Sequence, residues 1–192
     1  MKKIVLAGMM AALCAAPVYA ADAQKGQNGQ KAQGGEQQAR PSREVTAALN
    51  ELAKVPKFRD AVNELVYSAT MSMPVVLIPG YAKAAKTMRP DQASDKYGRE
   101  VRQITAAAGT VAQDPAVAAE TQEKLLALMG KRLGAEDIAR ITAFYRSPQG
   151  AATLTVLPEG VAQEAMDVAQ DVLKPRVQAV IGQQKQPAGK KK

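Results

Sequence analysis

Apolar side chains recur every three or four residues through most of residues 43–182, the spacing that places them on one face of a helix. Such a face is stable only when it is buried against other elements, so the helices must pack on one another. Residues 153–157 are the one candidate strand, and their leucines fit a helix equally well. The pattern predicts an all-α fold, a single bundle of about six or seven short helices.

Start signals divide this region into its expected helices. Ser42 can cap the first, and Asp114 followed by Pro115 combines an N-cap with proline at the first helical position. We expect helices from residue 43, from residue 56, from about residue 91, over 115–130, over 135–146, over 148–157, and from 159 to about 180 with a bend near Pro175.

The two ends of the chain differ from this region in composition. Residues 1–20 contain two lysines, an apolar run and a small-residue cleavage site ending at Ala20, which is the pattern of a signal peptide. Residues 21–42 form a leader rich in Gln, Gly and Lys, and residues 183–192 form a basic tail. Neither has the bulky apolar residues that repay the entropy of ordering. We expect a periplasmic or secreted protein with one helical domain over residues 43–182 and flexible ends.

Composition argues against several classes of function. The chain has no histidine, and its only cysteine, Cys14, lies in the signal peptide, so the commonest general base, zinc ligand and thiol nucleophile are missing. Residues 44–184 carry 16 basic and 16 acidic side chains, so the net charge of +8 comes from the ends. A nucleic-acid-binding face would concentrate basic residues in the fold. We expect no enzyme activity, cofactor, metal, bound nucleic acid or membrane span.

The densest motif is FYRSPQG at residues 144–150, with an acidic helix-opening position before it at Glu136 and a Leu-Pro-Glu step after it at residues 157–159. Together these residues resemble the bacterial family called domain of unknown function 2059, which comprises small exported proteins. The resemblance is strong over residues 130–185 and looser over residues 43–78. It implies a helical periplasmic domain, and it implies no activity and no catalytic residue.

Two interpretations of this motif remain open. In the favoured one, Ser147 caps a following helix, Pro148 is its first residue, and Gly150 lets the preceding helix pass closely, so that the motif fixes an interhelical angle. In the other, Arg146 beside that helix N-terminus binds an anion or a carboxylate. The candidate interaction corner consists of Phe144, Tyr145, Arg146, Ser147, Pro148 and Gly150.

Two further clusters have a structural and a functional interpretation. Glu164, Asp167 and Asp171 form an acidic stripe that could serve a carboxylate-dependent envelope hydrolase, although this spacing is typical of a solvated helix face. Met71 and Met73 could bind copper(I), but side chains two residues apart on a helix point to different sides, which favours core filling.

The most apolar stretch is residues 73–79, which we expect to be a buried segment between breaks at Pro74 and Pro79. Alternatively, Met73, Val76 and Leu77 line a site for a small apolar or amphiphilic ligand. In the tail, Lys190, Lys191 and Lys192 are candidates for tethering the protein to anionic envelope surfaces.

These observations favour a non-enzymatic periplasmic domain that interacts with an unidentified protein or envelope component. The carrier of an apolar ligand is the alternative, and the hydrolase ranks below it.

Overall fold

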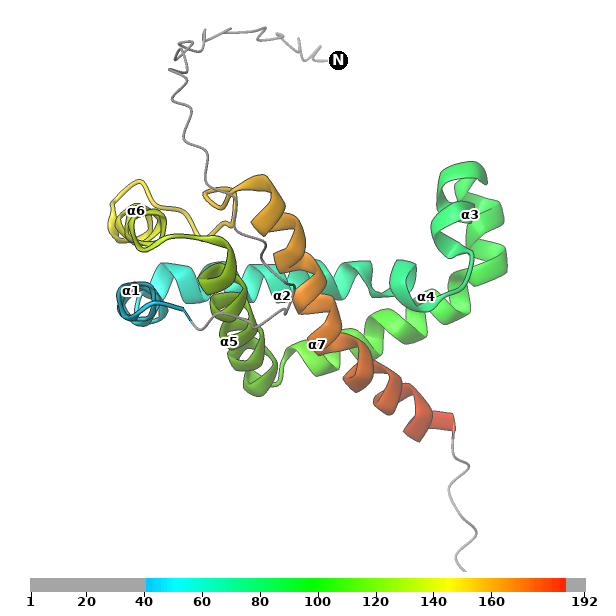
Figure 1. Cartoon of the computed structure of the whole chain (residues 1–192). Coiled ribbons are helices and arrows are strands. Elements are labelled where there is room, and N and C mark those ends of the chain that lie inside the picture. Colours follow the sequence, from blue (N-terminus) through cyan, green and yellow to red (C-terminus); the bar gives the residue numbers. More distant parts are fainter. Residues whose placement is uncertain (1–40, 186–192) are drawn as a thin grey trace, which may run out of the picture. The chain divides into compact units, whose positions relative to one another are not determined.

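The structure is a computed structural model that describes residues 41–185 (Figure 1). Those residues form seven helices and no strand, which confirms the all-α prediction. The helices are α1 Arg43–Ala53, α2 Pro56–Leu77, α3 Tyr81–Thr87, α4 Pro90–Ala112, α5 Pro115–Arg132, α6 Ala135–Arg146 and α7 Glu159–Lys185. The predicted signal peptide, most of the leader and the tail lysines 190–192 lie outside the described residues.

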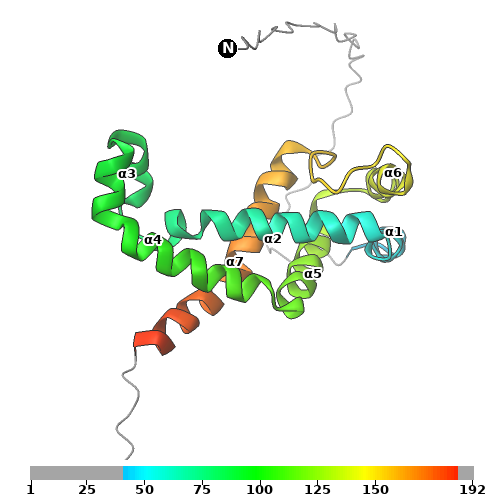
Figure 2. The same ribbon diagram turned by 180° about the vertical axis from the view of Figure 1, so that it is seen from behind.

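Two long helices organise the packing. The α2 helix contacts α4, α5 and α7, and α7 in turn contacts α4 and α5, so the last helix of the chain crosses the others (Figures 1 and 2). The α1 helix packs mainly on α6, and the short α3 helix joins α2 to α4 and contacts both. The predicted apolar stripe of α2 is buried throughout, at Phe58, Val62, Leu65, Val66 and Ala69.

The predicted helix starts are confirmed by their hydrogen bonds. Ser42 Oγ accepts from the backbone N–H of Val45 at 3.2 Å, and Asp114 Oδ1 accepts from the N–H of Ala116 at 2.9 Å. These bonds satisfy N–H groups that have no partner within the helix.

Several predicted boundaries were wrong. The α3 helix was not expected, and residues 148–157, expected to be helical, form turns and bends. Pro74 lies inside α2, which instead ends before Ile78, the extended residue that precedes Pro79. Gly130 lies inside α5, and a Cβ there would come within 3.0 Å of Leu49, so this glycine allows α1 to pack closely rather than ending the helix. The α7 helix, expected to end at about residue 180, continues to Lys185 and contains Pro175.

No single helix among residues 41–185 is long and apolar enough to cross a membrane. Taken together, α2 and α3 reach the required length and composition, but the chain bends by 95° between them.

One buried polar atom gives a test of the core. Thr121 is fully buried in α5, and its hydroxyl has no hydrogen-bond partner among the described residues. An unsatisfied buried donor costs about 1–3 kcal/mol. We expect Thr121→Val to raise the free energy of unfolding by about 1 kcal/mol, because valine keeps the shape and removes the hydroxyl.

The control for this substitution is Thr142→Val. Thr142 is also buried, but its hydroxyl donates to the Ile138 carbonyl at 2.8 Å, so its loss should lower stability by about 1 kcal/mol. Both variants are measured by urea denaturation, and equal destabilisation by the two would contradict the prediction.

Candidate functional site

The FYRSPQG motif closes α6 rather than opening a new helix. Ser147 is extended, with φ −72° and ψ 156°, as expected of a residue before proline. Its Oγ donates to the Phe144 carbonyl at 2.7 Å and accepts from the Gly150 N–H at 3.0 Å. The prediction that Ser147 and Pro148 start a helix is therefore wrong, because the serine hydroxyl is used to end the preceding one.

Gly150 is held against the last turn of α6. A Cβ at this position would lie 2.2 Å from the Phe144 carbonyl oxygen, which no side chain can tolerate without moving the backbone. The prediction that glycine permits a close approach is confirmed. The chain can fold back on α6 only because residue 150 has no side chain.

Tyr145 belongs to the core rather than to the surface. Its side chain is 1% exposed, its hydroxyl donates to the Thr153 carbonyl at 2.6 Å, and its ring meets the edge of Phe58 with centroids 5.6 Å apart. Burial raises the pKa of the Tyr145 hydroxyl to about 12. A partner cannot reach this side chain in the folded protein.

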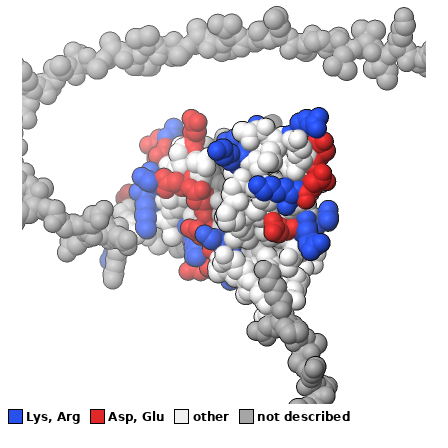
Figure 3. Space-filling view, turned by 90° about the vertical axis from the view of Figure 1, so that its right-hand side faces the viewer, with Lys and Arg blue, Asp and Glu red and all other residues white. Residues whose placement is uncertain are grey.

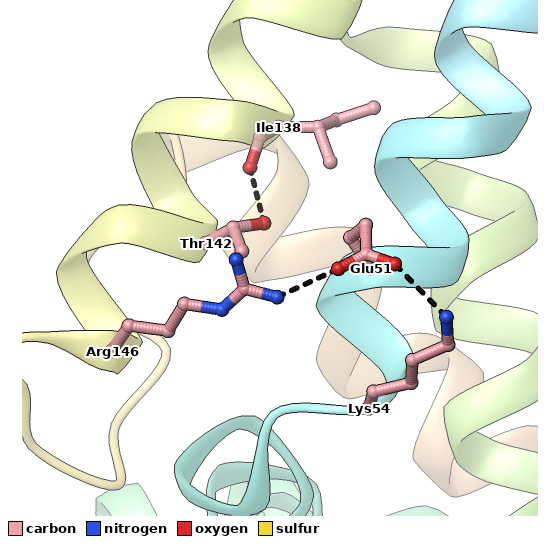
Figure 4. A network of polar contacts seen from close by, with 5 residues as sticks. All are labelled: Glu51, Lys54, Ile138, Thr142 and Arg146. Atoms are coloured by element: carbon pink, nitrogen blue, oxygen red, sulfur yellow. Dashed lines mark hydrogen bonds and ion pairs between the residues drawn. The ribbon is translucent and has the colours of Figure 1, made fainter.

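Arg146 pairs with Glu51 of α1 at 2.8 Å, and Lys54 binds the other oxygen of the same carboxylate at 2.9 Å (Figure 4). Lys57, in the first turn of α2, donates to the Ser147 carbonyl at 2.7 Å. The motif is thus connected to both α1 and α2. The helix N-terminus that the anion-binding interpretation requires does not exist, because residues 148–157 are not helical.

The Glu51 carboxylate gives a pH-dependent prediction. Hydrogen bonds from Lys54 and then Arg146 hold the pKa of this carboxyl below its ordinary value of 4.5. A depressed folded-state pKa adds stability above pH 4.5, and that stability is lost as the pH falls through the folded-state value. We expect wild type to have a slightly higher Tm than Arg146→Ala at neutral pH, because exposed pairs contribute little.

This difference in Tm should shrink as the pH is lowered below 4.5, because protonated Glu51 no longer attracts Arg146. Thermal denaturation followed by circular dichroism from neutral pH downward measures it. A difference in Tm that stays constant across that range would contradict the prediction.

The three side chains of the acidic stripe have different surroundings. Arg132 binds Glu164 with two hydrogen bonds, Nη2 to Oε1 at 2.7 Å and Nε to Oε2 at 3.3 Å, while Asp167 and Asp171 are exposed. Within residues 41–185, no three acidic, histidine or cysteine side chains are grouped so that they could hold a metal ion. The two methionines lie on different sides of α2, Met73 in the core and Met71 on the surface.

The predicted apolar lining is only partly brought together. Leu77 borders a hollow of about 520 Å³ between the end of α2, α4 and the end of α7. Ile78, Ile104 and Ile181 supply its other aliphatic walls. Met73 is instead buried in the core, and Val76 is half-buried outside this lining.

A second apolar surface was missed in the sequence. Four large apolar side chains stand out as exposed among the described residues: Tyr67 (62%), Met71 (57%), Val75 (48%) and Met88 (37%). The first three are four residues apart on α2, which makes a second apolar stripe beside the buried one. That spacing was the available signal, although a stripe alone does not reveal that nothing covers it.

Tyr67, Met71 and Met88 border two hollows that lie along one face of α4, and we call these two hollows together the α4 groove. The first, of about 460 Å³, has Tyr67 and Met71 on one side and Thr105, Gly109 and Ala112 of α4 on the other. The second, of about 440 Å³, lies between Met88 and the Ser94, Gly98 and Arg102 face of α4.

The α4 positions along the groove are mostly small, and they span residues 94–112. At 1.5 Å per residue, this face is about 27 Å long. Figure 2 shows α2 and α4 from the side opposite Figure 1. In this view α2 passes in front of α7, and no described helix lies in front of α2. The α4 face along the two hollows is therefore as long as a helix of about 18 residues.

The charge distribution over the described domain is mixed. Figure 3 shows the side of the molecule on which α3 lies, where basic and acidic side chains are interspersed with uncharged surface. Of the side chains lining the two hollows of the α4 groove, only Arg102 is charged. The groove thus joins an apolar wall, a floor of small residues and one cation.

The described residues form an all-helical bundle. Its densest sequence motif, residues 144–150, lies at the end of α6, and we call it the α6 corner. Residues 120–179, which include this corner, match the model of a family described as an uncharacterized protein conserved in bacteria, domain of unknown function 2059. The match confirms the predicted family resemblance over about a third of the 192-residue chain. No curated protein and no solved structure matches the chain.

Proposed function

We propose that this protein is a non-enzymatic, periplasmic docking domain that binds a partner protein in the α4 groove. The observation that carries the proposal is the gathering of exposed apolar side chains: Tyr67, Met71 and Met88 all border the groove, and Val75 continues the stripe of the first two. Contiguous exposed apolar surface in a folded domain commonly marks an interaction site.

The shape of the groove supports a protein partner. Recognition of a helix in a groove uses apolar anchors that enter between two helices, and the small residues of α4 leave room for such anchors. By contrast, Tyr145 and Ser147 of the FYRSPQG motif use their hydroxyls in bonds within the fold, and Arg146 is paired with Glu51 at the surface. These contacts favour a structural role for the corner and a binding role for the groove.

The proposed location rests on the sequence of residues 1–20. If these residues are a cleaved signal peptide, the protein isolated from the periplasmic fraction begins near Ala21, as N-terminal sequencing would show. Recovery of the uncleaved chain in the cytoplasmic fraction would refute the periplasmic assignment.

Site-specific photo-crosslinking in living cells tests the docking function. A photoreactive phenylalanine analogue replaces Tyr67 in the groove, and in a matched control it replaces Gln149, which is exposed at the α6 corner. We expect a discrete adduct from position 67 and none from position 149. Position 145 is unsuitable, because the Tyr145 side chain is buried.

A blocking variant separates docking from nonspecific capture. Gly109 lies in the groove, and no atom lies within 4 Å of the position that a Cβ would take there, so Gly109→Leu should occupy the groove without disturbing the core. We expect this change to remove the adduct at position 67 while leaving the helical circular dichroism unchanged. An adduct that persists, or equal capture from positions 67 and 149, would show that the groove is not the docking surface.

A carrier of an apolar ligand is the second candidate, supported by the aliphatic walls of the hollow beside Leu77. Native mass spectrometry of the protein after gentle extraction would show a ligand-bound mass. A spectrum that shows the mass of the free chain alone would argue against a carrier.

A further inference from the structure

We propose that the occupant of the α4 groove is an amphipathic helix of the partner protein that presents a carboxylate side chain to Arg102. This inference rests on the docking function proposed for the groove and names the chemistry of the partner. It follows from the position of Arg102, from its missing counter-charge and from the dimensions of the groove.

Arg102 lies at the middle of the groove. It lines the hollow beside Met88, and the next turn of α4 brings Thr105, which lines the hollow beside Tyr67. Its Nη1 atom lies 3.4 Å from the position that a Cβ of Gly98 would take. The guanidinium is therefore folded back along α4 over Gly98 rather than extended away from the groove.

No ion pair within residues 41–185 uses Arg102, and no other charged side chain lines the two hollows. Arg102 is exposed at the edge of the groove, where its guanidinium can bind a carboxylate through two parallel hydrogen bonds. A cation on the corresponding face of a partner would be repelled, so Arg102 would also exclude the wrong partners.

The charges of the segment that contains Arg102 also favour an acidic partner. Residues 81–102 contain six basic and three acidic side chains, a net charge of +3. The remainder of residues 44–184 contains ten basic and 13 acidic side chains, a net charge of −3. The segment formed by α3 and the start of α4 thus carries an excess of basic side chains while the rest of the domain carries an excess of acidic ones, an asymmetry that favours an acidic partner near Arg102.

The concave shape favours a helix over a membrane surface. The floor residue Gly109, which has open space at its Cβ position, lies beside the larger side chain of Met71. A helix about 10 Å in diameter can place its own side chains on that floor. A lipid bilayer is flat on this scale and would contact the exposed ridge rather than the floor.

Designed peptides test the carboxylate directly. The probe is a fluorescent 18-residue helical peptide with leucines at i, i+3, i+4 and i+7 spacing and one glutamate at the centre of the leucine face; its variants carry glutamine or lysine there. Fluorescence anisotropy with the mature chain, residues 21–192, should show the glutamate peptide binding about tenfold more tightly than the lysine peptide.

A charge reversal in the groove should invert this order. With Arg102→Glu, we expect the lysine peptide to bind more tightly than the glutamate peptide. The matched control is Arg99→Glu: Arg99 is exposed, has no ion pair among the described residues and does not line the groove. It should preserve the wild-type order. No binding by any peptide, or the same order in wild type and Arg102→Glu, would overturn the proposal.

Other occupants would give different results. Co-sedimentation with phosphatidylglycerol vesicles that depends on Arg102, without peptide discrimination, would replace the partner helix with a lipid headgroup. Sedimentation velocity showing a dimer that Gly109→Leu abolishes would replace it with a second copy of the chain. Either result overturns the inference.

The cellular adduct separates this inference from the docking function. If Arg102→Glu leaves the adduct from position 67 unchanged, the groove still docks a protein but the carboxylate contact is wrong. If position 67 gives no adduct in wild type, the docking function itself fails. We expect Arg102→Glu to reduce the adduct yield about tenfold and Arg99→Glu to leave it unchanged.

Discussion

Gly150→Ala should lower the free energy of unfolding by about 3 kcal/mol, at the upper end of the usual cost of overpacking. The new methyl group would lie 2.2 Å from the Phe144 carbonyl oxygen, so the backbone itself must move. That movement would also disturb the bond from the Gly150 N–H to Ser147 Oγ. Urea denaturation of wild type and variant under identical conditions measures the change.

Gly109→Ala is the matched control. This glycine lies inside α4 with open space around its Cβ position, so alanine should raise stability by about 0.5–1 kcal/mol through helix propensity. If the two alanine variants have similar stabilities, the close approach at residue 150 is not essential for folding.

Phe58→Ala should lower the free energy of unfolding by about 4 kcal/mol. Phe58 is fully buried at the start of α2, and its ring meets Tyr145 edge to face, so its removal leaves a cavity between α2 and the α6 corner. The loss combines the transfer free energy of the ring, the cavity and the aromatic pair.

Tyr67→Ala, on the same helix, provides the comparison. Its side chain is 62% exposed in the α4 groove, so we expect a change in stability within about 0.5 kcal/mol. Urea denaturation of both variants compares the contribution of the buried stripe of α2 to stability with that of the exposed stripe. A loss at Tyr67 as large as that at Phe58 would mean that the groove residues belong to the core.

The N-capping residues of the helices were among the features that the sequence predicted correctly. Ser42 and Asp114 each cap the helix that their side chains predicted. The apolar spacing of α2 correctly identified Phe58, Val62 and Ala69 as core residues. These features depend on a few neighbouring residues, so they can be predicted without knowing the tertiary structure.

The Ser147-Pro148 pair shows where local signals became ambiguous. A serine before a proline can start a helix, but proline also drives the residue before it out of helical geometry. Here the second effect prevails, because Gly150 can turn back onto α6 and Tyr145 holds the Thr153 carbonyl. Both contacts depend on the tertiary packing of residues 144–153.

The groove could not be predicted for a related reason. Tyr67 and Met71 look like core residues by their chemistry, and their exposure depends on which side of α2 receives α7. The same applies to Leu77, which borders a hollow while Met73, one helical turn earlier, is buried. Sequence periodicity identifies an apolar face but does not show whether another helix covers it.

The position of α7 has a consequence for the timing of folding. The last helix contributes Ala165, Ala169, Leu173 and Val177 to the centre of the bundle, against α2, α4 and α5. During synthesis, which proceeds from the N-terminus, the earlier helices exist for some time with this side of their core open to solvent. The native state therefore becomes accessible only when residue 177 has left the ribosome, which gives chaperones a period in which to bind an incompletely folded chain.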